Sequence, residues 1–227
     1  MAIADRSERL SFPAGERTLP GLWSEAGTAR AIAVVAHGAG AGMEHPFLAG
    51  VAGGLAASEV AALRFDFPYR VTGRRSPDPP AVLLEAWRGA LEAAADRSNG
   101  RPLAATGKSL GGRMASMLAA EMGGMFPAAA LVFFGYPLHA PGRPEKTRDA
   151  HLPSIRIPML FIQGTADALA RFDLIEELVA RLGPIARLHV VEGGDHSFRV
   201  RGTRRPDEET GEELGAVAAR FLHEVVS

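Results

Sequence analysis

Hydrophobic residues in this chain gather into short continuous runs instead of alternating with polar ones. After residue 30 such runs occupy residues 31–36, 60–67, 103–106, 129–134 and 158–163, with a sixth near 188–191. Strands that are apolar on both faces are typical of a sheet that is covered by helices on each side. The pattern therefore predicts a mostly parallel, buried sheet.

Between these runs the apolar positions follow a helical period. They recur three and four residues apart over 82–94 and again over 172–182, where Gly183 and Pro184 end the pattern. A last helix is predicted by apolar positions from Leu214 to Val225, and Thr210-x-x-Glu213 predicts a capping box at its start. Alternating strands and helices favour an α/β fold, a twisted sheet with helices on both faces and the binding groups at the carboxyl ends of its strands.

Two segments differ from this pattern. Residues 10–24 alternate around a turn at Pro13-Ala14-Gly15, which predicts an antiparallel hairpin before the parallel sheet. Residues 141–158 are rich in proline and charge but lie between two core strands, so we interpret them as a surface loop. The segment after Pro137 is too short for a helical lid, and we expect a shallow, open site. Residues 1–227 fit one domain.

Composition narrows the range of partners. The 227 residues carry a net charge of −1 and no cysteine, so the chain can form no disulfide and nothing global draws it to nucleic acid or acidic membranes. The first ten residues lack the apolar core of a signal peptide, and no segment reaches the roughly 18 uninterrupted apolar residues of a membrane span. We expect a cytoplasmic protein with a small-molecule substrate, no nucleic-acid partner and no membrane partner.

The strongest chemical signal is Gly107-Lys108-Ser109-Leu110-Gly111, where an apolar strand stops at a serine and a helix opens. This is the layout of a nucleophile elbow, in which a sharp turn exposes the serine hydroxyl beside a base and oxyanion donors. Glycines suit so tight a turn because they carry no side chain. The same Gly-Lys-Ser could end a phosphate-binding P-loop, but Pro102 stands where that motif needs glycine.

A serine nucleophile needs a histidine to take its proton and a carboxylate to orient that histidine. Of the seven histidines, His196 alone lies in a loop after a late strand. Asp167 follows the run 158–163 through a Gly-Thr-Ala turn, so we predict it as the acid; Asp195 and Asp66 are weaker alternatives. The order Ser109, Asp167, His196 is the one used by α/β-hydrolases.

These residues carry a resemblance that extends over nearly the whole chain. The matching stretches are His37-Gly38-Ala39-Gly40, Gly107-Lys108-Ser109-Leu110-Gly111-Gly112, Gly164-Thr165-Ala166-Asp167 and Gly194-Asp195-His196-Ser197. The chain resembles the α/β-hydrolase superfamily, and within it the small, lidless dienelactone-hydrolase-like branch of bacterial hydrolases. Dienelactone hydrolases proper carry a cysteine where this chain has a serine.

The resemblance implies that the backbone N–H groups of Ala39 and Leu110 form the oxyanion hole, each such donor typically contributing a factor of about 10²–10³. We expect the neighbouring His37, Gly38 and Gly40 to face the substrate. A dinucleotide fingerprint counted from Gly38 fails, because its third glycine falls at Met43.

Arginines are frequent in three loops that the predicted fold brings to this edge. They are Arg70, Arg74 and Arg75, then Arg143 and Arg148, then Arg199, Arg201, Arg204 and Arg205. One hypothesis is that they select an anionic substrate, with Arg70 and Arg74 as contacts; the alternative is ordinary solvated charge balanced by nearby carboxylates. Aromatic residues are too sparse there for base stacking.

These patterns predict a serine hydrolase that cleaves a small carboxylic ester or thioester. Ser109 would form an acyl-enzyme, His196 would shuttle the proton and Asp167 would hold the imidazole. No cofactor or metal is expected, because the histidines lack a ligand spacing such as H-E-x-x-H. Two alternatives remain: a peptidase on short peptides that uses the same residues, and a non-catalytic binding or scaffold protein on the same fold.

Overall fold

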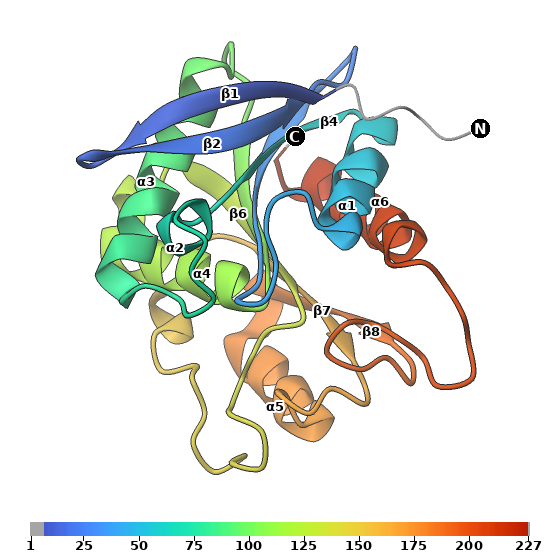
Figure 1. Ribbon diagram of the computed structural model, residues 1–227. Helices are drawn as coiled ribbons and strands as arrows, with labels where there is room; N and C mark the ends of the chain where they lie inside the picture. The colour runs from blue at the N-terminus through green and yellow to red at the C-terminus, as the bar shows by residue number, and fades with distance from the viewer. Residues whose placement is uncertain (1–6, 227) are drawn as a thin grey trace.

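An eight-stranded sheet forms the centre of the molecule, as seen in a computed structural model that describes residues 7–226 (Figure 1). The strands are β1 (Ser7–Ala14), β2 (Arg17–Ser24), β3 (Ala31–Ala36), β4 (Val60–Phe65), β5 (Leu103–Lys108), β6 (Ala128–Phe134), β7 (Met159–Gly164) and β8 (Ala186–Val191). Their order in the sheet is β1-β2-β4-β3-β5-β6-β7-β8. Strands β3 to β8 are mutually parallel, whereas the hairpin β1–β2 joins β4 in antiparallel register. The predicted fold class and N-terminal hairpin are confirmed.

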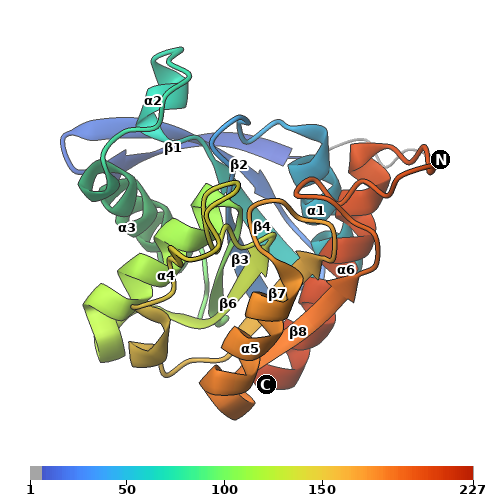
Figure 2. The same ribbon diagram turned by 90° about the horizontal axis from the view of Figure 1, so that it is seen from below.

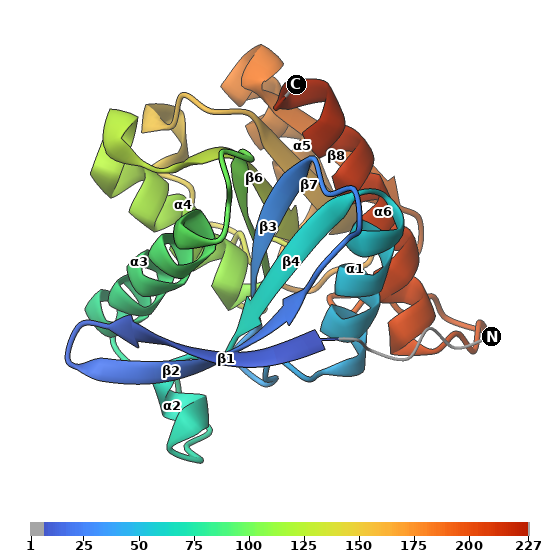
Figure 3. The same cartoon turned by 90° about the horizontal axis from the view of Figure 1, so that it is seen from above.

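Helices cover both faces of the sheet (Figure 3). They are α1 (Pro46–Ala57), α2 (Pro68–Val71), α3 (Pro80–Asp96), α4 (Leu110–Met122), α5 (Phe172–Leu182) and α6 (Asp207–Val225), with short 3₁₀ turns at Gly123–Met125, Leu152–Ser154 and Gly183–Ile185. Helices α1 and α6 pack on one face, and α3, α4 and α5 on the other. The sheet therefore separates two apolar cores, and all six residues of β3 and of β4 are buried between them.

Helices α1 and α6 approach each other through glycine. A Cβ atom added to Gly50 would lie 1.9 Å from the Glu208 carbonyl oxygen, and one added to Gly54 would lie 2.0 Å from that of Glu212. The contact is reciprocal, because a Cβ on Gly211 would lie 2.1 Å from the Phe47 carbonyl oxygen. The two backbones thus touch without intervening side chains.

The start of α6 differs from the prediction. The helix begins at Asp207, one turn before the expected capping box, and Thr210 lies inside it with its hydroxyl donating to the Pro206 carbonyl at 3.3 Å. The capping-box prediction was wrong because three acidic residues in the first turn, Asp207 to Glu209, already complement the positive end of the helix dipole. Helix α1 was not predicted from periodicity because its own residues are small or apolar on every face, so no polar face marks a helical period.

The carboxyl ends of the parallel strands meet at one edge of the sheet, which is seen from below in Figure 2. The loops after β3, β4, β6, β7 and β8 gather there, and the short helix α2 projects from the body of the molecule (Figure 2). Residues 139–151 form a loop without a helical lid, as predicted. Within residues 7–226, no helix combines the length and the apolar character that crossing a membrane requires.

Candidate active site

Ser109 occupies the turn between β5 and α4. Its backbone has φ +50° and ψ −114°, an unfavourable conformation for a residue with a side chain and the one that a nucleophile elbow requires. The turn is crowded: a Cβ on Gly107 would lie 2.3 Å from the backbone nitrogen of Gly112, and a Cβ on Gly111 would lie 2.6 Å from the Ala36 carbonyl oxygen. The glycines are needed here because backbone fills the space that a side chain would take.

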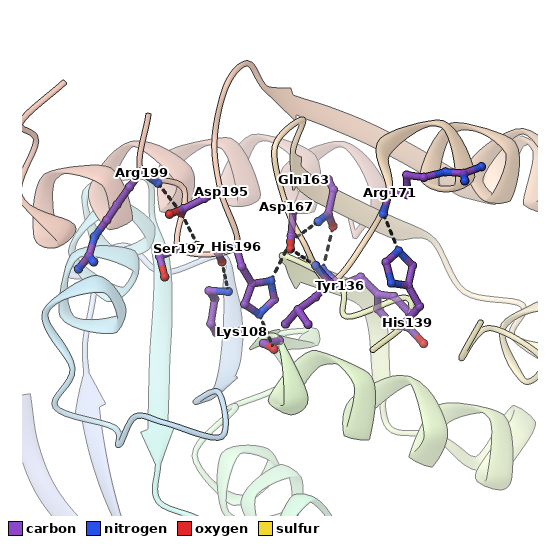
Figure 4. Close-up of polar contacts among 12 residues, drawn as sticks. Lys108, Tyr136, His139, Gln163, Asp167, Arg171, Asp195, His196, Ser197 and Arg199 are labelled. Atoms are coloured by element: carbon purple, nitrogen blue, oxygen red, sulfur yellow. Dashed lines mark hydrogen bonds and ion pairs between the residues drawn. The ribbon is translucent and has the colours of Figure 1, made fainter. Parts of the chain in front are cut away.

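His196 lies between the serine and an aspartate. Its Nε2 is 2.8 Å from the Ser109 Oγ. Its Nδ1 is 2.7 Å from the Asp167 Oδ2 (Figure 4). Both distances are hydrogen bonds, so the structure brings the three side chains into one chain of contacts across 87 residues of sequence. With its proton on Nδ1, the imidazole donates to the carboxylate and accepts from the serine hydroxyl.

Asp167 is buried at the end of β7 and is held by three donors. Gln163 donates from Nε2 to Oδ2 at 2.6 Å, the backbone N–H of Leu169 donates to Oδ1 at 2.8 Å, and His196 supplies the third bond. Gln163 is itself fixed, because its Oε1 accepts the Tyr136 N–H at 2.9 Å. Sequence reasoning missed Gln163, since a glutamine at the end of an apolar strand gives no signal of its partner.

The alternative acids have other contacts. Asp195 accepts from the N–H groups of Ser197 and Arg199 at 2.7 and 3.0 Å and so closes the turn that carries His196. Asp66 accepts the Met43 N–H at 2.7 Å. Neither carboxylate bonds the His196 imidazole, which Asp167 already holds.

Lys108 is a second residue that sequence reasoning missed. Its ammonium group donates to the backbone carbonyl of His196 at 2.6 Å (Figure 4). The same group lies 5.3 Å from the centre of the Phe198 ring. Burial lowers the pKa of Lys108 to about 8, although the carboxylates of Asp167 and Asp195 act in the opposite direction. The side chain therefore ties the serine's strand directly to the histidine's loop.

The two N–H groups predicted as oxyanion donors are not engaged in other hydrogen bonds in the described part of the chain. Within residues 7–226, neither the Ala39 N–H nor the Leu110 N–H donates to a backbone or side-chain acceptor. The Gly38 carbonyl accepts His37 Nδ1–H at 2.7 Å, and because C=O and N–H point in opposite directions across a trans peptide, this bond turns the Ala39 N–H away from His37. The Tyr69 hydroxyl supports the same loop by donating to the Ala39 carbonyl at 3.1 Å.

His37 does not face the substrate, so that expectation was wrong. Its side chain is fully buried, and its Nε2 accepts the Phe67 N–H at 3.1 Å. Burial lowers the pKa of His37, which keeps the ring neutral and suited to this pair of backbone contacts. Gly38 is also buried, whereas Ala39 and Gly40 are exposed at the surface of the loop.

Three of the nine loop arginines are paired with carboxylates. Arg74 donates to Asp78 at 2.6 Å, Arg199 to Asp207 at 2.9 Å, and Arg205 to Glu213. For these three side chains, the contacts favour the interpretation of solvated charge balanced by carboxylates. Arg70 is exposed, and its guanidinium lies beside Gly42 in the loop between β3 and α1. No acid in the described chain is within ion-pair distance of Arg70.

A serine at a strand–helix elbow, bonded to a histidine at the carboxyl edge of a parallel sheet, is the arrangement of an α/β hydrolase. The comparison with known families agrees: the chain belongs to the alpha/beta hydrolase domain family, which matches residues 29–226. The resemblance noted in the sequence is thereby confirmed.

Solved structures share the fold over almost the full chain. A dienelactone hydrolase from Anabaena variabilis is 22% identical with a TM-score of 0.74, covering 98% of this chain and 99% of its own. A lidless serine hydrolase from Xanthomonas campestris is 17% identical with a TM-score of 0.74, over 100% and 98% of the two chains. An esterase domain from Rhodothermus marinus is 15% identical with a TM-score of 0.75, over 98% and 100%.

Proposed function

We propose that this protein is a serine hydrolase that cleaves a small carboxylic ester or thioester through an acyl-enzyme on Ser109. The observation that supports the proposal is the unbroken series of bonds from the Ser109 hydroxyl through His196 to Asp167. A hydroxyl is a weak nucleophile until a base accepts its proton, and the Nε2 of His196 is within reach to do so. Exposed Ala39 and the start of α4 supply donors beside it.

In the first half-reaction Ser109 Oγ attacks the carbonyl carbon while its proton passes to His196 Nε2. The carbonyl oxygen takes up negative charge, which the N–H groups of Ala39 and Leu110 stabilise. The imidazolium is stabilised by Asp167 Oδ2 and then gives its proton to the departing alcohol or thiol. The bond between carbonyl and leaving group breaks, and the acyl group stays on Ser109.

In the second half-reaction water replaces the leaving group. His196 accepts a proton from the water as its oxygen attacks the acyl carbon, and the same proton returns to Ser109 when the ester bond to the enzyme breaks. The products are a carboxylic acid and the free enzyme. Because the segment 139–151 forms no lid, the site stays open to solvent, and we expect small, soluble esters to react without a closure step.

Labelling with a fluorophosphonate tests the proposal directly. The wild type is expected to be labelled on Ser109 and to hydrolyse members of a panel of short-chain esters and thioesters, while Ser109→Ala loses the label and at least about 10³-fold in kcat. Ser116→Ala is the matched control, because Ser116 bonds His151 and not His196. A folded wild type that takes no label would favour a scaffold protein, and cleavage of short peptides in preference to esters would favour a peptidase.

A further inference from the structure

The outer side of α4 borders a hollow that belongs to no part of the candidate active site. The segment after β6 hangs below the body of the molecule and returns against α4 (Figure 1). Between them lies an open surface hollow of about 540 Å³. Arg113 and Met117 line it from the helix, and Arg148 and His151 line it from the returning segment. Ser109, Asp167 and His196 do not line it.

The two arginines of this hollow are not neutralised. Within residues 7–226 no carboxylate lies within ion-pair distance of Arg113 or Arg148. The acids nearby are already engaged: Glu121, which also lines the hollow, binds Arg88 at 2.5 Å, and Asp149 binds Arg181. The hollow therefore carries two arginines whose positive charge no carboxylate of the described chain neutralises.

Arg113 makes this positive charge costly. Unlike an arginine at an exposed loop tip, it is only partly exposed, and its Nε is fully enclosed with no hydrogen-bond partner in the described part of the chain. Burial, together with the charge of Arg148, lowers the pKa of the Arg113 guanidinium. A buried donor without a partner is unfavourable, so an anion in the hollow would relieve both the desolvation and the repulsion.

His151 can add a third nitrogen donor to the hollow, because its Nδ1 carries a hydrogen when the ring is protonated. Ser116 donates its hydroxyl proton to the Arg113 carbonyl at 2.8 Å, so its Oγ accepts from His151 Nε2–H at 2.8 Å. Burial and the charge of Arg113 lower the pKa of His151, while Asp149 acts in the opposite direction. An anion beside the ring would favour the imidazolium and raise that pKa.

We propose that the hollow binds the anionic group of a small organic phosphate or carboxylate, with Arg113 and Arg148 as its two cationic contacts. The planar guanidinium groups suit the oxygens of either anion, and Met117 with Ala120 offers an apolar wall to the rest of the ligand. Binding there does not depend on the chemistry proposed for Ser109.

Titrations of the full-length protein test this site. Phenyl phosphate and benzoate are the two anionic probes, and benzyl alcohol is the neutral control, with backbone amide shifts of residues 113–121 and 147–154 as the readout. At least one anion is expected to shift these amide resonances in a saturable way, and benzyl alcohol is expected to leave them unchanged. Whichever anion binds tighter identifies the ligand class. Absence of saturable shifts with both anions overturns the proposal.

Variants separate a built site from general positive charge. Arg113→Gln and Arg148→Gln are each expected to weaken binding about tenfold or more, the loss of one charge-assisted hydrogen bond. Arg143→Gln, on the exposed part of the same loop, is the matched control and should keep the wild-type affinity. Equal weakening of anion binding in all three variants would overturn the proposal. If Arg113→Gln does not fold, the comparison of Arg148→Gln with Arg143→Gln tests the proposal.

Two further readouts make the outcome specific. The imidazole resonances of His151 are expected to titrate at higher pH when the anion is bound, and an unchanged titration contradicts contact with the ring. Fluorophosphonate labelling of Ser109 is measured on the same samples. Anion binding without labelling of Ser109 would contradict the hydrolase proposal and support the anion site. Labelling of Ser109 without anion binding would support the hydrolase proposal and contradict the anion site.

Discussion

At the scale of single residues, Lys108 shows how a charge supports the proposed chemistry without touching substrate. Its bond to the His196 carbonyl fixes the loop that carries the imidazole, so it is a positioning residue. We expect Lys108→Met to lower kcat about tenfold or more with little change in KM, because small displacements of a catalytic group are costly. Steady-state kinetics on an ester that Ser109→Ala fails to cleave measures both constants. Lys146→Met, at an exposed loop position, is the control.

The pH profile gives a second, independent reading of Lys108. Because its pKa is about 8, the side chain loses its charge just above neutral pH, and the anchoring bond weakens as the ammonium becomes an amine. The wild type is expected to lose kcat on the alkaline side with an apparent pKa near that value, whereas Lys108→Gln should lack this limb. An identical alkaline limb in the variant would assign it to another group.

Residue-scale contacts also show where sequence reasoning ends. The contact of Ser109, Asp167 and His196 could be anticipated, since each follows a strand of a parallel sheet and such ends share one edge; their catalytic roles stay a prediction until tested. The roles of Gln163 and Lys108 could not be anticipated. Gln163 bonds a buried carboxylate and Lys108 bonds a backbone carbonyl, and only folding brings these partners close.

At the scale of elements, the contact between α1 and α6 is a packing constraint with a direct test. Gly54→Ala places a Cβ 2.0 Å from the Glu212 carbonyl oxygen, so the helices must separate, and we expect a loss of about 1–3 kcal/mol in the free energy of unfolding. Gly53→Ala is the matched control on the same helix, since nothing lies within 4 Å of its added Cβ. It should gain up to about 1 kcal/mol from helix propensity. Urea denaturation measures both, and equal stability of the two variants would contradict the packing argument.

Element boundaries follow from the same physics. Strands β3 to β7 could be predicted because burial on both faces leaves an unbroken apolar run. The amphipathic α3 and α5 could be predicted because one side of each helix meets water. Helix α1 is covered by α6 and by the sheet, so its sequence lacks the polar stripe that would reveal a period. The start of α6 was misplaced because acidic residues, not a capping side chain, favour its first turn.

At the scale of the whole molecule, burial of the Lys108 ammonium links stability to pH. The folded chain releases this proton near pH 8, while the unfolded chain holds it to about 10.4, so the unfolded state binds more protons in between. This group therefore makes the free energy of unfolding rise with pH across that window. Urea denaturation of wild type and Lys108→Met between pH 8 and pH 10 is expected to show the rise in the wild type relative to the variant. Parallel curves would mean that the lysine is solvated in the folded state.

Finally, the glycine contact between α1 and α6 bears on how such a protein can acquire new substrates. The oxyanion loop leads directly into α1 and the His196 loop into α6, and Phe47 of α1 stacks on Phe198 at 5.6 Å between ring centres. Because the two backbones are in direct contact, we expect the helices to move as one body. The proposed oxyanion donors and the His196 imidazole are then held by the same rigid unit. Changes that reshape the entrance of the site, whether by evolution or by engineering, are therefore expected on its other side, at α2 and residues 139–151. Insertions there leave the α1–α6 pair undisturbed.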